Sequence, residues 1–267
     1  MSTITLASWN VNSLRVRLPQ VLDWLASSRT DALVIQETKL TDDQFPRAAF
    51  EEAGMHVLFT GQKTYNGVAL VARKESFRRI EPLALNLPGY PDEQKRLVEA
   101  RLETPSGASL VFTGVYVPNG SEPGTQKYLY KLDWLAALER HLTDRLSENP
   151  NLVIGGDFNI APADIDCWNP KLFEGAILAS APERLAFSRL LSLGLVDSFR
   201  TLNPGKNDFS WWDYRNRAFD ANEGVRIDHL LVSQALADSM KSAAVDRLPR
   251  ANKQPSDHAP VTLTLEL

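Results

Sequence analysis

Short apolar runs of strand length recur along the whole chain. Most are rich in Val, Ile and Leu and are bounded by Gly, Pro, Asn or Asp, a pattern typical of strands buried against a second layer. On this basis we expect strands at residues 3–8, 32–35, 67–72, 97–102, 109–117, 152–154, 227–232 and 260–265.

Between these runs lie segments in which apolar residues, mostly leucines, recur at the three- and four-residue spacing of a helix face. We expect helices at residues 15–26, where Pro19 lies near the start, and at residues 127–146 and 182–193. The strands therefore alternate with helices, but the alternation is irregular.

The order of these elements indicates the fold class. The turn at residues 105–107 favours an antiparallel hairpin between two consecutive strands, and hence mixed sheets over a pure repeat of parallel strands. We expect an α/β protein with two sheets covered by helices. Because the sequence shows no break in composition, no Gly/Ser-rich linker and no internal repeat, we expect residues 1–267 to form a single domain.

Composition excludes several classes of protein. Lys and Arg number 29 against 33 Asp and Glu, for a net charge of -4, and 43% of the residues are hydrophobic. These proportions exclude a disordered chain and a polybasic tail protein. A single cysteine, Cys167, cannot form a Cys-based zinc site. The N-terminal sequence does not resemble a signal peptide and no apolar run approaches about 20 residues, so we expect a cytoplasmic protein.

Polar side chains gather where the predicted strands end or begin. Each of six strand ends carries a carboxylate, an amide, a phenol or an imidazole, and loops at strand ends commonly display functional residues. These residues are Asn10 and Asn12, Glu37, Tyr116, Asp157 and Asn159, Asp228, and Asp257 and His258.

Taken alone, most of these residues have an ordinary structural interpretation. Asp157 follows two glycines, which is typical of a turn, and asparagines suit Asx turns. Asp228 is harder to explain, because it lies within an apolar strand and a buried carboxylate needs a partner. That partner is a His, an Arg or a metal ion, and Arg226 is the simplest candidate.

Taken together, the residues indicate a specific chemistry. A carboxylate-rich cluster without cysteines suits a hard divalent cation, Mg²⁺ or Mn²⁺. His258 beside Asp257, with Asp228 in a strand, supplies the parts of an imidazole that is oriented by a carboxylate. A metal ion, an imidazole and neutral amide donors are what the in-line attack of water on a phosphodiester requires.

Six short motifs also match a known family. They are WNVNS at 9–13, QET at 36–38, YNG at 65–67, GDFN at 156–159, RID at 226–228 and SDH at 256–258. In this order and at this spacing, the chain resembles the exonuclease III class of bacterial abasic-site endonucleases, within the endonuclease/exonuclease/phosphatase superfamily. The resemblance covers essentially the whole chain. It implies a four-layer α/β sandwich, with two mixed β-sheets packed face to face and flanked by helices.

For the metal site, the resemblance implies Mg²⁺, with Mn²⁺ as a substitute, at one edge of the sheets. Glu37 resembles the metal-binding glutamate of the family, with Asn10 close to it. The implied metal ligands are Asn10, Glu37, Asp157, Asn159, Asp257 and His258.

For catalysis, Asp157 resembles the carboxylate that positions or deprotonates the attacking water, and Asn159 the amide that orients the site. Tyr116 resembles the tyrosine near the scissile phosphate. His258 resembles the histidine that contacts the phosphate and is paired with Asp228.

For substrate binding, residues 209–214 resemble an aromatic stretch that helps to form the pocket for a flipped-out abasic sugar, which needs apolar walls. Residues 165–181 depart from the main abasic endonucleases and are more similar to a branch in which 3′-exonuclease or 3′-phosphatase activity dominates. The expected substrate contacts are Asn12, Lys63, Asn119, Trp211, Val225 and Ile227.

The leading prediction is a Mg²⁺-dependent DNA-repair phosphodiesterase. It would hydrolyse the backbone 5′ to abasic sites, or remove 3′ nucleotides and 3′-blocking phosphates from duplex DNA, as a monomer without a membrane or an obligate protein partner. A bound cation and a local basic rim would allow an acidic protein to bind DNA. Two alternatives stay open: a superfamily phosphatase acting on an inositol phosphate or phospholipid, and a catalytically inactive interaction module.

Overall fold

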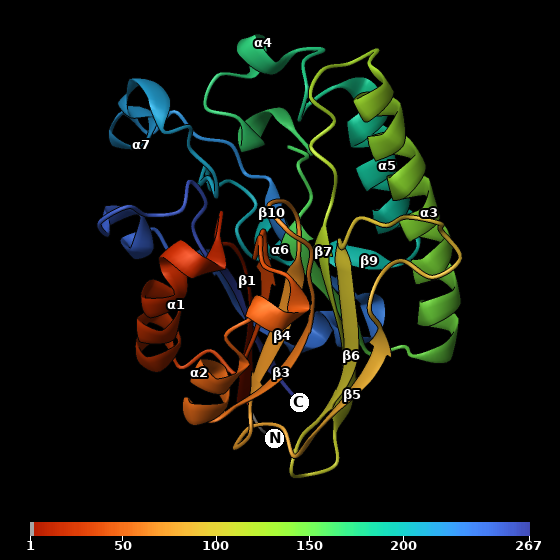
Figure 1. Ribbon diagram of the computed structural model, residues 1–267. Coiled ribbons are helices and arrows are strands. Elements are labelled where there is room, and N and C mark those ends of the chain that lie inside the picture. Colours follow the sequence, from red (N-terminus) through yellow and green to blue (C-terminus); the bar gives the residue numbers. More distant parts are fainter. Residues whose placement is uncertain (1–2) are drawn as a thin grey trace.

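The computed structural model describes residues 3–267. Two mixed β-sheets pack face to face, and helices cover both outer faces (Figure 1). The four-layer α/β sandwich expected from the sequence is therefore confirmed.

Each sheet has six strands. The strand order is β11-β12-β1-β2-β4-β3 in the first sheet and β5-β6-β7-β8-β10-β9 in the second. The strands of the first sheet are β1 (Thr3–Asn10), β2 (Ala32–Gln36), β3 (Met55–Thr60), β4 (Val68–Arg73), β11 (Met240–Val245) and β12 (Val261–Glu266). Those of the second are β5 (Arg79–Ala84), β6 (Leu97–Glu103), β7 (Ser109–Tyr116), β8 (Leu152–Asp157), β9 (Leu195–Asp197) and β10 (Asp228–Ser233).

Four helices form the two outer layers (Figure 1). Helices α1 (Leu14–Ser28) and α2 (Arg47–Glu52) cover the first sheet, and α3 (Gln126–Glu148) and α5 (Ala181–Ser192) lie side by side on the second. The shorter helices are α4 (Pro170–Phe173), α6 (Ser198–Leu202), α7 (Ala218–Ala221) and the 3-10 turns Asp42–Gln44, Asp164–Asp166, Arg215–Arg217, Gln234–Ser239 and Leu248–Ala251.

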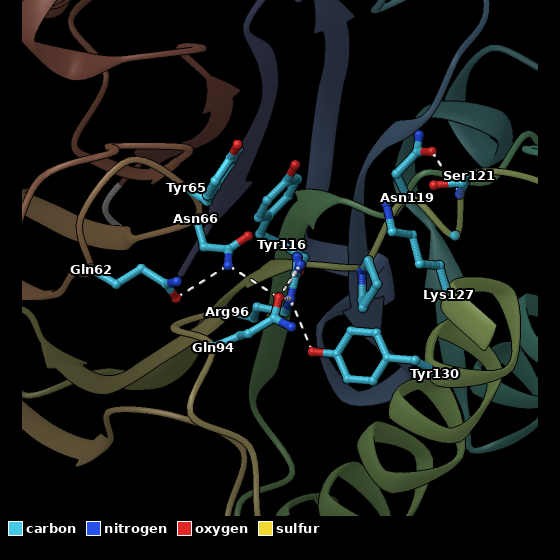
Figure 2. Close-up of a pocket in the computed structure, with 12 residues that line it drawn as sticks. Gln62, Tyr65, Asn66, Gln94, Arg96, Tyr116, Asn119, Ser121, Lys127 and Tyr130 are labelled. Carbon is cyan, nitrogen blue, oxygen red and sulfur yellow. Dashed lines mark hydrogen bonds between the residues drawn. The ribbon is translucent and has the colours of Figure 1, made fainter.

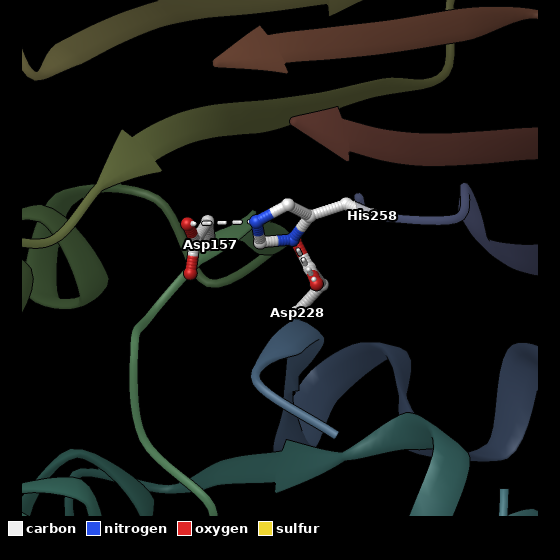
Figure 3. Close-up of side chains that lie close together, drawn as sticks. All are labelled: Asp157, Asp228 and His258. Atoms are coloured by element: carbon white, nitrogen blue, oxygen red, sulfur yellow. Dashed lines mark hydrogen bonds and ion pairs between the residues drawn. The ribbon is translucent and has the colours of Figure 1, made fainter. Parts of the chain in front are cut away.

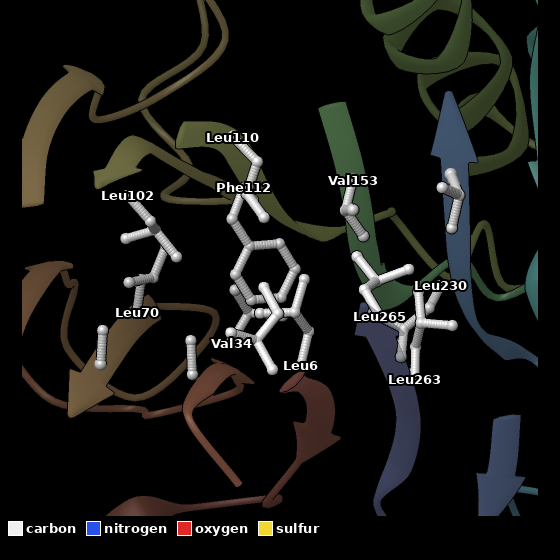
Figure 4. Packing of buried hydrophobic residues seen from close by; sticks show 14 of the residues in the cluster. Leu6, Val34, Leu70, Leu102, Leu110, Phe112, Val153, Leu230, Leu263 and Leu265 are labelled. Atoms are coloured by element: carbon white, nitrogen blue, oxygen red, sulfur yellow. The ribbon is translucent and has the colours of Figure 1, made fainter. Parts of the chain in front are cut away.

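The largest apolar cluster fills the space between the two sheets (Figure 4). Side chains that alternate along the strands, such as Leu6, Val34 and Phe112, point into it from both sides. Burial of each such side chain contributes about 1.5–3 kcal/mol. The sheets approach closely at Gly114, where a Cβ atom would lie 2.7 Å from Cγ1 of Val34.

Two parallel strand pairs position the polar strand ends. β1 runs parallel to β2, and β7 runs parallel to β8, whereas the other strand pairs of residues 3–267 are antiparallel. The carboxyl ends of parallel neighbours lie at the same edge of a sheet, so Asn10 lies near Glu37, and Tyr116 is in register with Asp157. β10 begins at Asp228, directly opposite Asp157. All these strand ends therefore meet at one edge of the sandwich.

The sequence pattern predicted eight strands, three long helices and the hairpin of β6 with β7, and all are confirmed with shifts of a few residues. It missed β3, β5, β9 and β11. These are the four edge strands of the two sheets. An edge strand is paired on one side and is often short or polar, so β5, β9 and β11 lack the apolar run that marks a central strand. β3 does contain the apolar run Val57-Leu58-Phe59, which the strand prediction did not include. β5 contains Pro82, and β9 has only three residues.

Candidate active site

The centre of the site is a buried group of Asp157, Asp228 and His258 (Figure 3). Nδ1 of His258 lies 2.8 Å from Oδ2 of Asp228, and Nε2 lies 3.8 Å from Oδ2 of Asp157. The imidazole therefore lies between the two carboxylates, one from β10 and one from β8.

The expectation that Asp228 has a buried partner is met by His258, and the simplest candidate, Arg226, is not that partner. Arg226 instead pairs with Asp166 at 2.7 Å and with Asp197 at 2.8 Å. Arg226 lies just before β10, and these two carboxylates satisfy its charge. It therefore has different partners from Asp228, although the two are close in sequence.

Asn10 joins the two carboxylates that follow the parallel strand pairs. Its Nδ2 donates to Oε1 of Glu37 at 2.8 Å and to Oδ2 of Asp157 at 2.9 Å. Glu37 has a φ of 54°, a left-handed conformation that is uncommon for a residue other than Gly or Asn and that is often found at functional sites. The turn at Glu37 thus places a second carboxylate, a common metal ligand, near Asp157.

Asn159 holds Asp157 from the other side. Its backbone N–H donates to Oδ1 of Asp157 at 2.9 Å, and its Nδ2 donates to the carbonyl oxygen of Val117 at 3.0 Å. Asn119 donates through Nδ2 to Oδ1 of Asn159 at 3.0 Å. The amide of Asn159 is therefore fixed at both ends, and Asp157 cannot rotate freely.

Burial and neighbouring charges shift the protonation of the central groups. Burial raises the pKa of Asp157 to about 7; the charge of Asp228 acts in the same direction and that of His258 against it. Burial acts to lower the pKa of His258, but the charges of Asp228 and Asp157 outweigh it and raise this pKa to about 10. The imidazole is therefore held as a cation, as is needed to stabilise a phosphate oxyanion.

Tyr116 lies beside the carboxylates at the end of β7. Burial, followed by the charges of Glu37 and Asp157, raises the pKa of its hydroxyl well above the ordinary value. The guanidinium of Arg96 lies 4.8 Å from the centre of its ring. The phenol is therefore neutral and able to donate a hydrogen bond near neutral pH.

Asp257 is next to His258 in sequence, but its carboxylate is held by different groups. Its Oδ1 accepts from Nδ2 of Asn12 at 3.0 Å, and its Oδ2 accepts from Nε1 of Trp211 at 3.0 Å. Asp257 thus accepts hydrogen bonds from two residues that are expected to contact the substrate. It lies outside the group formed by Asp157, Asp228 and His258.

The residues expected to form the apolar walls of a pocket for an abasic sugar are mostly buried. Val225 is 0% and Ile227 is 2% exposed, and both pack in a cluster with Cys167. Trp211 is packed against this cluster and pairs with Val225 through the backbone. Lys63 is exposed in the loop that precedes β4.

Comparison with known proteins agrees with this geometry. Residues 7–258 match the Endonuclease/Exonuclease/phosphatase family. The chain belongs to this family. The family is hydrolytic and depends on divalent metal ions, so this chain is a metal-dependent hydrolase.

Three relatives of the family are similar over almost the whole chain. Exodeoxyribonuclease III of Haemophilus influenzae is 38% identical over 95% of this chain and 97% of its own length. The structure of the 3′ phosphatase NExo from Neisseria, bound to a product DNA hairpin, has a TM-score of 0.92 and 42% identity, with 99% of this chain and 100% of that chain covered. An AP endonuclease from Archaeoglobus fulgidus has a TM-score of 0.91 and 32% identity, with 99% and 100% coverage.

The donor set of this family member fits a divalent cation. One ligand atom each from Asp157, Asp228 and His258 lies within 4.8 Å of the others. Oδ1 of Asp228 is buried and has no hydrogen-bond partner among residues 3–267. A buried carboxylate oxygen without a partner is costly unless a cation or water satisfies it. Together with Glu37, these oxygens form the kind of site that hard cations prefer.

Three residues that position the site were not expected from the sequence. Oγ of Ser210 accepts from the backbone N–H groups of both Ile227 and Asp228 at 3.0 Å, and Oγ of Ser256 donates to the carbonyl oxygen of Asn10 at 2.7 Å. Nζ of Lys39 lies 2.9 Å from Oε2 of Glu37. Ser210 and Ser256 lie in motifs already noted, and that was the only available signal for them.

Among residues 3–267, no helix combines the length and the apolar character that crossing a membrane requires.

The side chain of Arg73 is bound within the fold. Arg73 donates to the carbonyl oxygens of Thr30 and Leu25, where it stabilises the end of α1. It therefore has a structural role away from the site.

Proposed function

We propose that this chain is a DNA-repair phosphodiesterase that removes 3′-blocking phosphates and 3′ nucleotides from duplex DNA more readily than it incises at abasic sites. The observation that carries the proposal is the buried arrangement of Asp157 opposite the His258–Asp228 pair. A carboxylate with a pKa near 7 can accept a proton from the attacking water. A cationic imidazole 3.8 Å away can stabilise the negative charge on a phosphate oxygen.

In the proposed step, a water oxygen attacks the phosphorus and the bond from phosphorus to O3′ breaks. The released O3′ takes up a proton from solvent to become the 3′-hydroxyl, and the other product is inorganic phosphate or a nucleoside 5′-monophosphate. Asp157 accepts a proton from the water at a carboxylate oxygen. His258, held by Asp228, stabilises the charge on a non-bridging oxygen, and Tyr116 donates a hydrogen bond to the same phosphate. Asn10 and Asn159 keep the Asp157 carboxylate in one orientation.

We infer that the cation is Mg²⁺, with Mn²⁺ as a substitute. Its proposed ligands are those expected from the sequence: Asn10, Glu37, Asp157, Asn159, Asp257 and His258. Oδ1 of Asp228, which has no hydrogen-bond partner among the described residues, would supply a further oxygen. When bound, the cation would supply positive charge that offsets the phosphate. Glu37 has 18% of its side chain exposed, whereas Asp157 and Asp228 are buried, so Glu37 lies where a cation can enter from solvent.

An opening of about 560 Å³ lies beside Tyr116 and offers a path for the DNA strand (Figure 2). Arg96 and Lys127 supply positive charge for phosphates, and Tyr65 and Tyr130 supply aromatic rings for sugars or bases. Asn119 lines the same opening and donates a hydrogen bond to Asn159. Together with exposed Lys63, this face suits an anionic polymer.

The burial of Val225 and Ile227 supports the proposed preference of the enzyme for 3′ ends over abasic sites. An abasic sugar that is rotated out of the helix needs a cavity with apolar walls, and these two side chains are buried against Cys167. A terminal 3′-phosphate needs no such cavity, because it reaches the carboxylates from the end of the strand. The relative that is a 3′ phosphatase has a higher identity to this chain, 42%, than the AP endonuclease at 32%.

The test compares two duplexes of the same sequence, one with a recessed 3′-phosphate and one with an internal abasic analogue. We expect faster single-turnover release of the 3′-phosphate. Faster incision at the abasic analogue would contradict the preference. Asp157→Asn serves as the control and should reduce both rates by about two to four orders of magnitude; equal turnover by this variant would contradict the mechanism.

A phosphatase of small or lipid phosphoesters is the alternative within the family. Filter binding separates the two, because a DNA enzyme should retain duplex DNA with a strong dependence on salt. We further propose that the protein acts as a monomer in the cytoplasm without an obligate partner. Light scattering of the purified protein at micromolar concentration tests the monomer, and a dimer mass would contradict it.

A further inference from the structure

A buried ion pair lies behind the site and takes no part in the chemistry described above. Nζ of Lys131 on α3 pairs with Oε1 of Glu183 on α5, and both side chains are 0% exposed. Burial of two charges costs several kcal/mol per ion, so such a pair contributes little net stability compared with apolar side chains of similar shape. Its other contacts indicate a different role.

The ammonium of Lys131 has three protons and three acceptors. Besides Glu183, it donates to the carbonyl oxygen of Asn159 at 2.7 Å and to that of Asn119 at 3.1 Å. These asparagines follow the ends of β8 and β7, and their side chains are joined by a hydrogen bond of 3.0 Å. One ammonium thus holds the backbone of both loops, while the side chain of Asn159 contacts Asp157.

The stem of Lys131 reaches this position because Gly120 leaves room for it. A Cβ atom at Gly120 would lie 3.0 Å from Cδ of Lys131, and Gly120 also has a φ of 89° that favours glycine. Burial lowers the pKa of Lys131, whereas the charges of Glu183 and Asp157 act to raise it. The ammonium is therefore linked to the site through its charge as well as through hydrogen bonds.

Glu183 connects the same ammonium to the loop at residues 165–181, which we expect from the sequence to differ from that of the main abasic endonucleases. Its carboxylate accepts from the backbone N–H of Leu178 at 3.2 Å and from that of Ser180 at 3.0 Å. The Lys131–Glu183 pair therefore lies between this loop and the two asparagine loops of the site.

We propose that Lys131 is a positioning residue which, paired with Glu183, holds the backbone of Asn119 and Asn159 so that the Asp157 carboxylate keeps its orientation toward the phosphate. This inference rests on the proposed function. Its consequence is that loss of the ammonium should slow turnover without weakening the binding of duplex DNA, since Lys131 itself has no exposed surface.

The experiment compares Lys131→Met with Arg145→Met, which lies on the same helix. Arg145 pairs with buried Glu99 at 2.8 Å, so each substitution leaves a buried carboxylate without that cation, but only Lys131 contacts the asparagine loops. We expect both variants to lower Tm. We expect only Lys131→Met to reduce kcat on the 3′-phosphate duplex, by about 10- to 100-fold with KM unchanged.

The double variant Lys131→Met/Glu183→Gln separates positioning from stability. It removes both buried charges, so Tm should recover relative to Lys131→Met while kcat stays low. Recovery of kcat together with Tm, an unchanged kcat in Lys131→Met, or an equal loss in Arg145→Met would overturn the inference. Inactivity of the wild-type protein on both duplexes would instead contradict the proposed function, and this inference with it.

Discussion

The imidazole of His258 and the carboxylate of Asp228 form a buried pair, with Nδ1 and Oδ2 separated by 2.8 Å. The two residues come from opposite sheets of the sandwich, since Asp228 begins β10 and His258 precedes β12. The pair therefore connects the two sheets at the edge where the catalytic side chains meet.

The first prediction concerns this pair. Asp228→Asn keeps the shape of the side chain but removes the charge that raises the pKa of His258. We expect single-turnover hydrolysis to fall by about two orders of magnitude or more, because the imidazole loses both orientation and positive charge. NMR titration of the metal-free protein should show a lower pKa for His258. An unchanged rate and an unchanged pKa would show that Asp228 does not tune His258.

The second prediction concerns the cation. EDTA should abolish hydrolysis, and added Mg²⁺ or Mn²⁺ should restore it. Mg²⁺ should also raise the Tm of the wild type, because a ligand that binds only the folded state stabilises it. Asn10→Ala removes the link between Glu37 and Asp157, so the metal concentration that gives half-maximal activity should rise by about 10- to 100-fold.

The control for this prediction is Asn151→Ala, because Asn151 is exposed at the opposite end of β8. It should leave the metal dependence unchanged. Full activity of the wild type in EDTA would refute the role of a cation, and equal metal dependence of Asn10→Ala and Asn151→Ala would refute the role of Asn10.

The third prediction concerns pH and stability. Burial, and then the charge of Arg226, lowers the pKa of His229 to about 4, and its two ring nitrogens contact Arg226 and the carbonyl oxygen of Ile160. Above pH 6.5 the histidine is neutral in both states and has no effect. As the pH falls from 6.5 to 4, the unfolded chain binds a proton that the folded protein excludes, so stability falls by up to roughly 3 kcal/mol.

Urea unfolding at several pH values measures this effect. His229→Gln keeps a donor for Ile160 and an acceptor for Arg226 but cannot take up the proton. The free energy of unfolding of this variant should therefore fall less steeply than that of the wild type between pH 6.5 and 4. Parallel curves for the two proteins would contradict the assignment of this proton to His229.

The fourth prediction concerns the packing of the two sheets. Gly114→Ala places a Cβ atom 2.7 Å from Cγ1 of Val34, so the sheets must shift apart under the site. We expect a loss of about 1–3 kcal/mol in the free energy of unfolding. Gly205→Ala is the matched control, because a Cβ there meets no atom within 4 Å, and it should stay within about 0.5 kcal/mol of the wild type. Similar losses in both variants would show that the contact with Val34 is not the cause.

Much of the fold could be predicted from the sequence because its signals are local. Central strands such as β2 and β8 are buried on both faces and therefore carry continuous apolar runs. The polar residues that follow these runs marked the candidate site for the same reason. The edge strands β5, β9 and β11 have no such run, and the pairing of edge strands is a property of the assembled sheets.

The sequence by itself determined that Asp157, Asp228 and His258 stand at strand ends, but only the tertiary structure decided how they pair. Asp257 is adjacent to His258 in the chain and contacts Asn12 and Trp211, whereas Asp228, 30 residues away, contacts the imidazole. Lys131 likewise lies on the buried face of α3 beside Tyr128 and Trp134, and its charge is satisfied by groups from other elements. Strand length and apolar character are set by neighbours in sequence. The partner of a polar side chain depends on register, on the direction of the side chain and on segments far apart in the chain, and these exist only once the sheets have packed together.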